Sequence, residues 1–159
     1  MIQGKTVIFG DNIDTDQIIG AHHLTLPSVA SMAPYAFEHH RQFTAHFTSG
    51  DILVAGNNFG CGSSREQAPA VLKDRGVAAI VAKSFARIFF RNAINLGLPV
   101  FVCQEADQIP DFANISISDD YLEELTTGRQ YQIVPLPPFI QAIVADGGII
   151  AHLRGKRKS

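Results

Sequence analysis

The sequence predicts an α/β domain built on parallel strands, because strand and helix patterns alternate through the middle of the chain. Two observations support this prediction: apolar runs of strand length, and glycines that follow each helical stretch between them. The central order is strand, loop, helix, strand, helix, strand, and such alternation requires parallel strands joined by right-handed crossovers. The chain has 159 residues and no internal repeat, so a single domain is expected.

The expected strands are short runs rich in β-branched, aromatic and other apolar residues: 6–9, 51–55, 77–82, 98–102, 115–118 and 131–134. The run 51–55 is apolar almost throughout, which indicates burial on both faces of a sheet. The expected helices are 65–75, a helix that Ser84 caps and Gly97 ends, a short helix from Asp119 or Asp120 to Thr127, and 139–145. Because Pro69 lacks an N–H, it restricts the regular part of the first helix.

Composition excludes several classes of protein. A basic end, residues 154–159, carries four cations, and without it the chain has a net charge of −6, which argues against nucleic-acid binding. No apolar run reaches the roughly 18–20 residues of a membrane helix, and the first residues lack the pattern of a secretory signal. Two cysteines, Cys61 and Cys103, make no disulfide framework, so a reduced cytoplasmic location is expected. We expect one domain over 1–153 and a frayed, disordered tail over 154–159.

The serine loop, residues 60–66 with the sequence Gly-Cys-Gly-Ser-Ser-Arg-Glu, is the most informative segment. Its glycines allow close approach to a ligand, and it leads into a helix start, where free N–H groups favour an anion. Ser63 and Ser64 supply hydroxyls, and Arg65 can bind a carboxylate with two N–H groups. These features predict a carboxylate or phosphate site that holds a nucleophile or base. The alternative is a simple helix cap, in which a serine bonds the first turn; both can hold if one serine caps and the other is free.

Other chemical motifs are weaker. The serine loop lacks the lysine of a phosphate-binding loop, the glycine spacing of an esterase elbow and the third glycine of a dinucleotide site. Three carboxylates in residues 11–17 fit Asx turns better than a calcium loop, because the closing glutamate is missing. Adjacent histidines such as His22 and His23 are expected to point in different directions, so no metal site is predicted. A catalytic thiol at Cys61 would need a base that the sequence does not identify.

Three segments together resemble one known family: Asp-Thr-Asp-Gln-Ile-Ile at 14–19, Asn-Phe-Gly-Cys-Gly-Ser-Ser-Arg-Glu at 58–66, and Ala-Lys-Ser-Phe-Ala-Arg-Ile-Phe at 82–89. In order and spacing, residues 5–153 resemble the small subunits of 3-isopropylmalate dehydratases, which are the detached swivel domain of the aconitase superfamily. The resemblance implies a swivelling domain with layers β/β/α and a mixed or parallel sheet.

The same resemblance implies a hydro-lyase, an enzyme that moves a hydroxyl between neighbouring carbons by dehydration and rehydration. In such enzymes a [4Fe–4S] cluster, held by three cysteines, binds the hydroxyl and a carboxylate of the substrate. This chain has only two cysteines, so a separate large iron–sulfur subunit is implied, in a heterodimer or heterotetramer. The substrate is a small di-acid, and neither nucleic acid nor membrane is an expected partner.

Residue roles follow from the resemblance by position. Ser63 matches the base, which as an alkoxide removes a proton from the carbon beside a carboxylate, and Asp16 matches a second catalytic position. Substrate binding is implied for Arg65, Ser64, Thr15 and Gly62, and the N–H groups from Gly62 to Arg65 are expected to stabilise the alkoxide. The 20–27 loop is expected to bind the variable group of the substrate through His23, Leu24, Thr25 and Leu26.

The composition of the 20–27 loop bears on the substrate. Leu24 and Leu26, with the neutral Thr25 between them, favour an apolar group such as isopropyl, and the arginine expected in homoaconitase-like members is missing. The predicted reaction therefore converts 2-isopropylmalate to 3-isopropylmalate, a step of leucine biosynthesis. Homocitrate or homoaconitate, citrate-like acids, methylmalate and 2,3-dimethylmalate stay open as substrates. A non-catalytic anion-binding module and a purely structural assembly subunit stay open as other classes of function.

Overall fold

One seven-stranded sheet organises the chain, in the order β4-β3-β2-β1-β5-β6-β7. A computed structural model describes residues 1–157. The parallel strands are β1 (Ile2–Ile8), β2 (Ile52–Ala55), β3 (Ala79–Ala82) and β4 (Val100–Val102). The antiparallel strands, which continue the sheet beyond β1, are β5 (Asn114–Ile117), β6 (Tyr121–Glu124) and β7 (Gln130–Gln132). The expected parallel core is confirmed, and the sheet as a whole is mixed.

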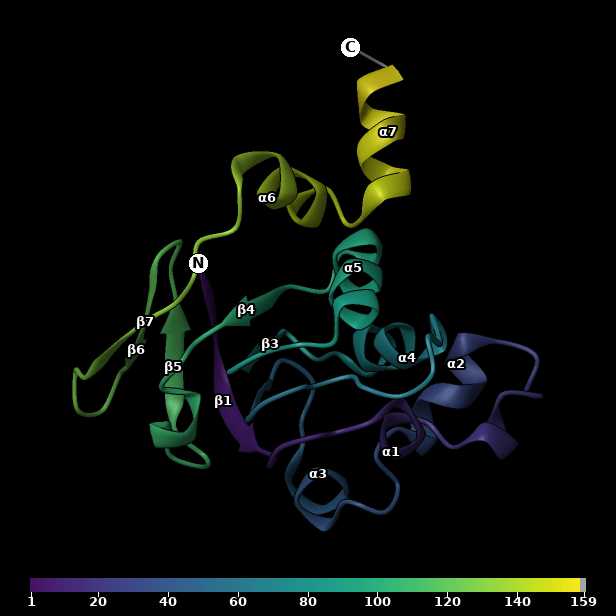
Figure 1. Cartoon of the computed structure of the whole chain (residues 1–159), viewed down its shortest axis with the longest axis horizontal. Coiled ribbons are helices and arrows are strands. Elements are labelled where there is room, and N and C mark those ends of the chain that lie inside the picture. Colours follow the sequence, from purple (N-terminus) through teal and green to yellow (C-terminus); the bar gives the residue numbers. More distant parts are fainter. Residues whose placement is uncertain (158–159) are drawn as a thin grey trace.

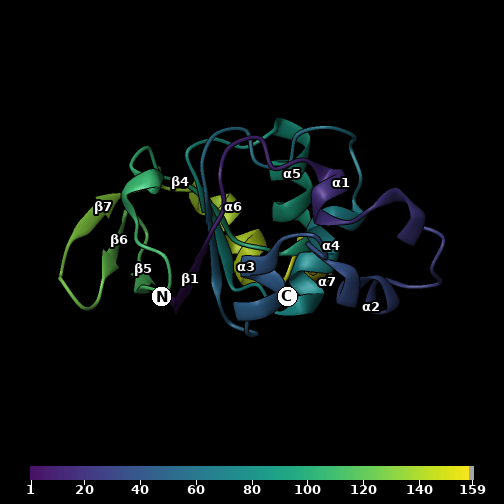
Figure 2. The same ribbon diagram turned by 90° about the horizontal axis from the view of Figure 1, so that it is seen from below.

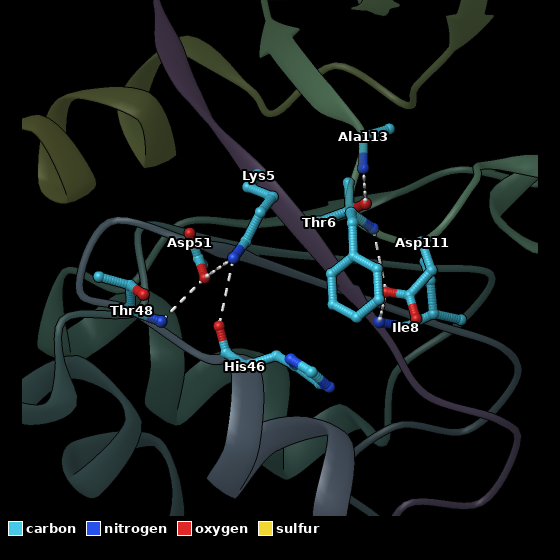
Figure 3. Close-up of polar contacts among 9 residues, drawn as sticks. Lys5, Thr6, Ile8, His46, Thr48, Asp51, Asp111 and Ala113 are labelled. Atoms are coloured by element: carbon cyan, nitrogen blue, oxygen red, sulfur yellow. Dashed lines mark hydrogen bonds and ion pairs between the residues drawn. The ribbon is translucent and has the colours of Figure 1, made fainter.

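The sheet changes direction at β1. The second half of β1 pairs with β2, with Thr6 opposite Ile52, whereas its first half pairs with β5, with Gly4 opposite Ile115. Side chains reinforce this junction (Figure 3). The hydroxyl of Thr6 donates to the carbonyl of Pro110 at 2.7 Å and accepts from the N–H of Ala113 at 2.9 Å. These bonds hold the antiparallel strands against the parallel part of the sheet.

An ion pair closes the other side of the same junction, also seen in Figure 3. Lys5 Nζ lies 3.6 Å from Asp51 Oδ2 and 3.2 Å from the carbonyl oxygen of His46. Asp51 Oδ2 also accepts the N–H of Thr48 at 2.9 Å. The carboxylate therefore fixes the chain just before β2, and with it the direction in which β2 enters the sheet.

Both faces of the parallel strands are buried, as the apolar runs predict. In β2, Leu53 and Ala55 belong to a core shared with the helices, while Ile52 and Val54 face the opposite core, with Ile115 and Leu122. Figures 1 and 2 show β5–β7 on one side of the parallel strands and α1–α5 on the other. The predicted β/β/α layering is confirmed.

The helices cluster in three places along the chain. Short helices precede β2: α1 (Thr15–Ile18), η1 (Ala21–His23), α2 (Val29–Met32), η2 (Ala33–Tyr35) and α3 (Arg41–His46). Two crossovers follow, α4 (Gln67–Arg75) and α5 (Arg87–Leu96), and later come η3 (Ala106–Gln108), α6 (Pro138–Ala145) and α7 (Ile149–Arg157). Gly76 and Gly97 end α4 and α5 in the left-handed conformation, as predicted from sequence. In the part of the chain that is described, no helix is long and apolar enough to cross a membrane.

Residues 119–127 form a hairpin strand and its turns, and the helix expected there is wrong. The N–H of Ser118 donates to the carbonyl of Tyr121 at 2.9 Å, so Asp119 and Asp120 occupy a tight turn. Burial then alternates along β6, with Leu122 and Glu124 inward. The two aspartates that suggested a helix cap lie in the turn instead, because residues 121–124 pair with β5 and β7 on either side.

The chain end also differs from expectation. Helix α7 continues through Arg157 and includes Arg154 and Lys156, so residues 154–157 are helical. Basic side chains in a last helical turn interact favourably with the helix dipole, which gives this basic segment a reason to stay helical. The remainder of the predicted disordered tail, residues 158–159, lies outside the described residues.

Candidate functional site

The serine loop lies at the carboxyl ends of three parallel strands, where α/β proteins usually bind ligands. Backbone hydrogen bonds join it to the segments that follow β1 and β3. Gly60 N–H donates to the Ile13 carbonyl at 2.7 Å, and Thr15 N–H donates to the Cys61 carbonyl at 2.9 Å. On the other side, Ala86 N–H donates at 2.9 Å to the carbonyl of Phe59, the residue that precedes the loop. The loop is thus held between two neighbouring segments by main-chain contacts.

Gly60 lets the loop lie directly on α5. Its φ is +85°, and a Cβ atom at this position would lie 2.2 Å from Phe89 Cγ. Beneath it, the rings of Phe59 and Phe89 pack edge to face with centroids 5.2 Å apart. Only glycine fits this backbone conformation and this contact.

Neither serine of the loop caps the following helix. Helix α4 begins at Gln67, and its N-cap, Glu66, has no side-chain capping bond, which removes the helix-cap alternative for both serines. Ser63 is exposed, and its Oγ lies 3.3 Å from Thr15 Oγ1, which also donates to the Ser63 carbonyl at 3.1 Å. Pro69 is the third residue of the helix, where its missing N–H has no acceptor to lose.

Ser84 does not cap the next helix, contrary to prediction. Helix α5 begins at Arg87 after Ala86, and Ser84 Oγ accepts the N–H of Asn58 at 2.8 Å. Residues 84–86 are extended because they bridge to Phe59. The hydroxyl therefore stabilises the start of the glycine-rich segment rather than a helix.

Arg65 and Asp16 form an ion pair beside Ser63. Arg65 Nη1 lies 2.6 Å from Asp16 Oδ1 and donates to the Ile19 carbonyl at 3.2 Å. The Arg65 side chain is 19% exposed and that of Asp16 68% exposed, so the guanidinium is held and the carboxylate reaches solvent. Both contacts use Nη1, and Arg65 retains N–H groups on Nε and Nη2 for a ligand.

The other two carboxylates near Asp16 have structural roles. Asp14 Oδ1 accepts the N–H of Gln17 at 2.8 Å and caps α1, and Asp11 Oδ1 accepts the N–H of Asn57 at 2.7 Å. The sequence predicted Asx turns here in preference to a calcium loop, whereas the α1 cap made by Asp14 was not predicted. Asp16 alone of the three is paired with a cation of the serine loop.

A cavity of about 280 Å³ opens beside Ser63. It brings together five predicted site residues: Thr15, Gly62, Ser63, Ser64 and Arg65. The first turn of α5 forms its other wall, so the positive end of that helix faces the cavity. Sequence reasoning missed the two polar residues on that wall, Arg87 and Asn92. The signal for Arg87 was its place at the start of the helix that follows β3, the third parallel strand.

One expected feature of the serine loop differs. The N–H of Arg65 donates to the Ser63 carbonyl at 2.9 Å, so it is occupied within the loop and does not point at a ligand. The positive α5 terminus and the Arg87 side chain stand on the opposite wall. Positive potential at this cavity therefore comes from two directions, although one of the expected backbone donors is used elsewhere.

The predicted residues of the 20–27 loop lie apart from this cavity. Leu24 and Leu26 pack partly on the helix-side core, Thr25 is exposed, and none of residues 23–26 lines the cavity. The hydrogen bond from His23 Nε2 to Glu38 Oε1, 2.8 Å long, holds the pKa of Glu38 below its ordinary value. The rings of His22 and His23 lie 3.9 Å apart, so the expectation that they point in different directions is wrong.

A larger hollow, about 610 Å³, lies elsewhere, between α6 and the strand ends. Its walls are mostly apolar, from residues such as Ile2, Phe101 and Leu136. It lacks the paired hydroxyls and the arginines of the Ser63 cavity, so its walls offer little chemistry for a di-acid. We therefore place the candidate active site at Ser63.

The two cysteines are too differently placed to share an iron–sulfur cluster. Both thiols are free; Cys61 is partly exposed in the serine loop, whereas Cys103 is buried in the core on the opposite side of the sheet. Burial raises the pKa of the Cys103 thiol, which disfavours the thiolate that binds iron. The residues of this chain do not fit a [4Fe–4S] cluster.

Comparison with known proteins gives consistent results. Residues 33–105 match the model of the aconitase C-terminal domain. The chain is 46% identical to the 3-isopropylmalate dehydratase small subunit of Wolinella succinogenes, covering 97% of this chain and 94% of that one. It is 48% identical to the subunit of the same name from Aliarcobacter butzleri, with 99% and 96% covered.

Two further similarities concern substrate and fold. The chain is 45% identical to the methanogen homoaconitase small subunit of Methanothermobacter thermautotrophicus, with 96% of this chain and 90% of that one covered. The crystal structure of 3-isopropylmalate dehydratase from Methanocaldococcus jannaschii superposes with a TM-score of 0.91 at 35% identity, covering 98% and 95% of the two chains. The fold is thus that of a known 3-isopropylmalate dehydratase, and the chain belongs to the 3-isopropylmalate dehydratase small-subunit family.

Proposed function

We propose that this chain is the small subunit of a hydro-lyase that isomerises 2-isopropylmalate to 3-isopropylmalate by removing and re-adding water. The observation that carries the proposal is the Ser63 hydroxyl, which is exposed beside a cavity, free of any capping role, and next to Arg65. The relatives described above bear the name of this activity. Leucine biosynthesis is the pathway in which this reaction occurs.

Ser63 is the proposed base. Its alkoxide would take the proton from the carbon beside a substrate carboxylate, and an alkoxide is costly unless positive charge and donors surround it. Thr15 Oγ1, at 3.3 Å, can turn its hydroxyl hydrogen toward Ser63 Oγ. Arg65, Arg87 and the N-terminus of α5 add positive potential at the same cavity.

Arg65 is the proposed ligand for a substrate carboxylate. Its guanidinium is already held by the Ile19 carbonyl and by Asp16, so little side-chain freedom is lost when a carboxylate binds its remaining N–H groups. We assign Asp16 the role of orienting Arg65, and Ser64 and Gly62 the role of lining the carboxylate site. Arg87 and Asn92, on the opposite wall, are added to the proposed substrate contacts.

A large partner subunit is part of the proposal. We assign it the [4Fe–4S] cluster, which would supply binding of the substrate hydroxyl and carboxylate, because Cys61 and Cys103 cannot supply the ligands. The exposed mouth of the Ser63 cavity would face that subunit, in a heterodimer or heterotetramer in the cytoplasm. The 20–27 loop would meet the side group of the substrate through His23, Leu24, Thr25 and Leu26 once the partner closes over it.

One observation points to a second substrate class: the chain is 45% identical to a homoaconitase small subunit. Homoaconitase-type substrates carry an extra carboxylate in place of the isopropyl group. Residues 20–27 contain no arginine or lysine to bind that charge, while Leu24 and Leu26 offer apolar surface. These features favour 2-isopropylmalate.

The test uses the complex that co-purifies with the tagged chain from its native source. We expect a brown complex with iron and sulfide, and the highest kcat/KM for 2-isopropylmalate among equal amounts of 2-isopropylmalate, homocitrate, citrate and 2,3-dimethylmalate. A preference for homocitrate would move the assignment to the second class. Carboxylate binding by the chain alone, with no iron-bearing partner, would refute the enzyme and leave an anion-binding module.

A further inference from the structure

Three imidazoles, two of them in the 20–27 loop, surround one carboxylate, and the proposed reaction uses only His23 of this group, as a contact to the substrate side group. The Nε2 atoms of His23, His22 and His39 lie 2.8, 3.6 and 3.7 Å from the same oxygen, Oε1 of Glu38. Only the His23 contact has the length of a hydrogen bond. The Nε2 atoms of His22 and His39 therefore lie near the carboxylate at distances longer than a hydrogen bond.

We propose that His22, His23 and Glu38 bind a divalent transition-metal cation, with Zn²⁺ as the best match. Two imidazoles and one carboxylate are a ligand set that suits Zn²⁺, and they leave one position for water or for the neighbouring His39. This inference concerns a site separate from Ser63 and does not depend on the proposed hydro-lyase activity.

The geometry needs little adjustment to hold the ion. The ligand atoms of the three residues all lie within 4.8 Å of one another. Tetrahedral Zn²⁺ with bonds of about 2.0–2.1 Å places its ligand atoms about 3.3 Å apart. The 3.6 Å separation between His22 and Glu38 is close to that value, and the 2.8 Å separation between His23 and Glu38 has to open by about half an ångström. His23 would bind as the neutral tautomer with its proton on Nδ1, so the metal replaces one hydrogen bond.

The neighbouring residues orient both histidines before any metal binds. The His23 side chain is 13% exposed, and its ring stacks on Tyr35 with centroids 4.0 Å apart and planes 12° apart. The His22 ring folds over Gly20, where an added Cβ would lie 2.8 Å from His22 Cε1. A side chain at residue 20 would therefore push the exposed His22 ring out of its position. The stacking of His23 on Tyr35 and the lack of a side chain at Gly20 therefore preorganise the site.

Metal binding would connect two separate parts of the chain. His22 and His23 belong to η1, while Glu38 follows η2, fifteen residues beyond His23. A cation between them would fasten the 20–27 loop to the segment around Tyr35. The expected consequence is a metal-dependent rise in the rigidity of this loop, measured as slower amide exchange of residues 20–27.

Titration of the full chain with ZnCl₂ by calorimetry, and with CoCl₂ by visible absorption, tests the site. We expect one ion per chain, a tetrahedral Co²⁺ spectrum, and about tenfold or greater weakening of Zn²⁺ binding in His22→Asn and in Glu38→Gln. His152→Asn is the matched control, because His152 Nδ1 also contacts a carboxylate, Asp146 at 2.7 Å, without a second imidazole. Zn²⁺ affinity should be unchanged in this control.

Gly20→Ala refines the test, because it retains all three ligands and displaces only the His22 ring. Weaker Zn²⁺ binding in this variant, with an unchanged thermal unfolding temperature, supports the geometry described. Cys61→Ser separates the site from adventitious thiol binding. Zn²⁺ affinity that is unaffected by His22→Asn and Glu38→Gln, or that is lost only in Cys61→Ser, would overturn the proposal.

Discussion

The serine loop and the 20–27 loop are held in different ways. Main-chain bonds tie the serine loop to Ile13 and Thr15 after β1, and they tie Phe59, the residue before the loop, to Ala86 after β3. The backbone bonds described for the 20–27 loop stay within it, such as His23 N–H to the Gly20 carbonyl, and its outside contacts are made by side chains. Main-chain contacts tolerate many side chains, whereas side-chain contacts change with sequence. The proposed reacting group therefore lies in the segment that the backbone fixes, and the proposed recognition of the substrate lies in the segment that side chains hold.

Ser63→Ala gives the largest expected effect and tests the serine loop as the reacting segment. Removing a general base is expected to lower kcat by about 10²–10⁴-fold, measured as isopropylmalate isomerisation by the assembled complex. The fold and iron content should stay the same, since Ser63 is exposed and caps no helix. Ser64→Ala is the neighbouring control and should lose much less activity. Normal turnover in Ser63→Ala would remove the base assignment.

Arg65→Lys tests the same segment through binding. A lysine keeps the charge but cannot present a planar fork to a carboxylate, so KM should rise about 10–100-fold while kcat changes less. Steady-state kinetics of the complex separates the two constants. The control is Lys73→Arg on α4, whose Nζ contacts the Leu96 carbonyl away from the cavity. An unchanged KM in Arg65→Lys would exclude the carboxylate role.

Gly60→Ala tests whether the serine loop depends on its close backbone contact. We expect destabilisation of about 2–4 kcal/mol in urea unfolding, since both a left-handed φ and a clash with Phe89 oppose the added Cβ. Gly128→Ala, with φ of +75° and open space around it, isolates the conformational cost and should lose about 1 kcal/mol. Equal losses at the two positions would show that contact with Phe89 contributes nothing.

Leu24→Ala tests the 20–27 loop and should have the smallest effect on the reaction. Loss of apolar surface is expected to raise KM for 2-isopropylmalate by about three- to tenfold, with kcat nearly unchanged and the preference over 2,3-dimethylmalate reduced. Competition between the two acids on the same complex measures the preference. Leu125→Ala, at an exposed position between β6 and β7, serves as control. A large fall in kcat would place Leu24 with the reacting segment and contradict the comparison.

Much of this molecule could be predicted from local sequence. The runs that form β2 and β3 could be predicted as strands from the sequence, because strands buried on both faces are apolar at every position. Gly76 and Gly97 stop helices through backbone conformation alone. The serine loop was identified as a site because glycines, hydroxyls and a guanidinium adjoin in sequence. The role of Ser63 as the base came from the resemblance, carboxylate binding by Arg65 came from both the residues and the resemblance, and both roles stay predictions.

Which polar groups meet depends on the way the chain folds in three dimensions. Asp119 and Asp120 could have capped a helix, but the free edge of β5 made residues 121–124 a strand. Ser84 could have capped α5, but its hydroxyl accepts the N–H of Asn58, a residue distant in sequence. Arg87 and Asn92 reach the Ser63 cavity, and His22, His23 and Glu38 gather around one point, through pairings between segments far apart in the chain. Backbone propensity acts over a few residues and is written in the sequence, whereas hydrogen bonds and ion pairs depend on distances that exist only once the sheet has formed.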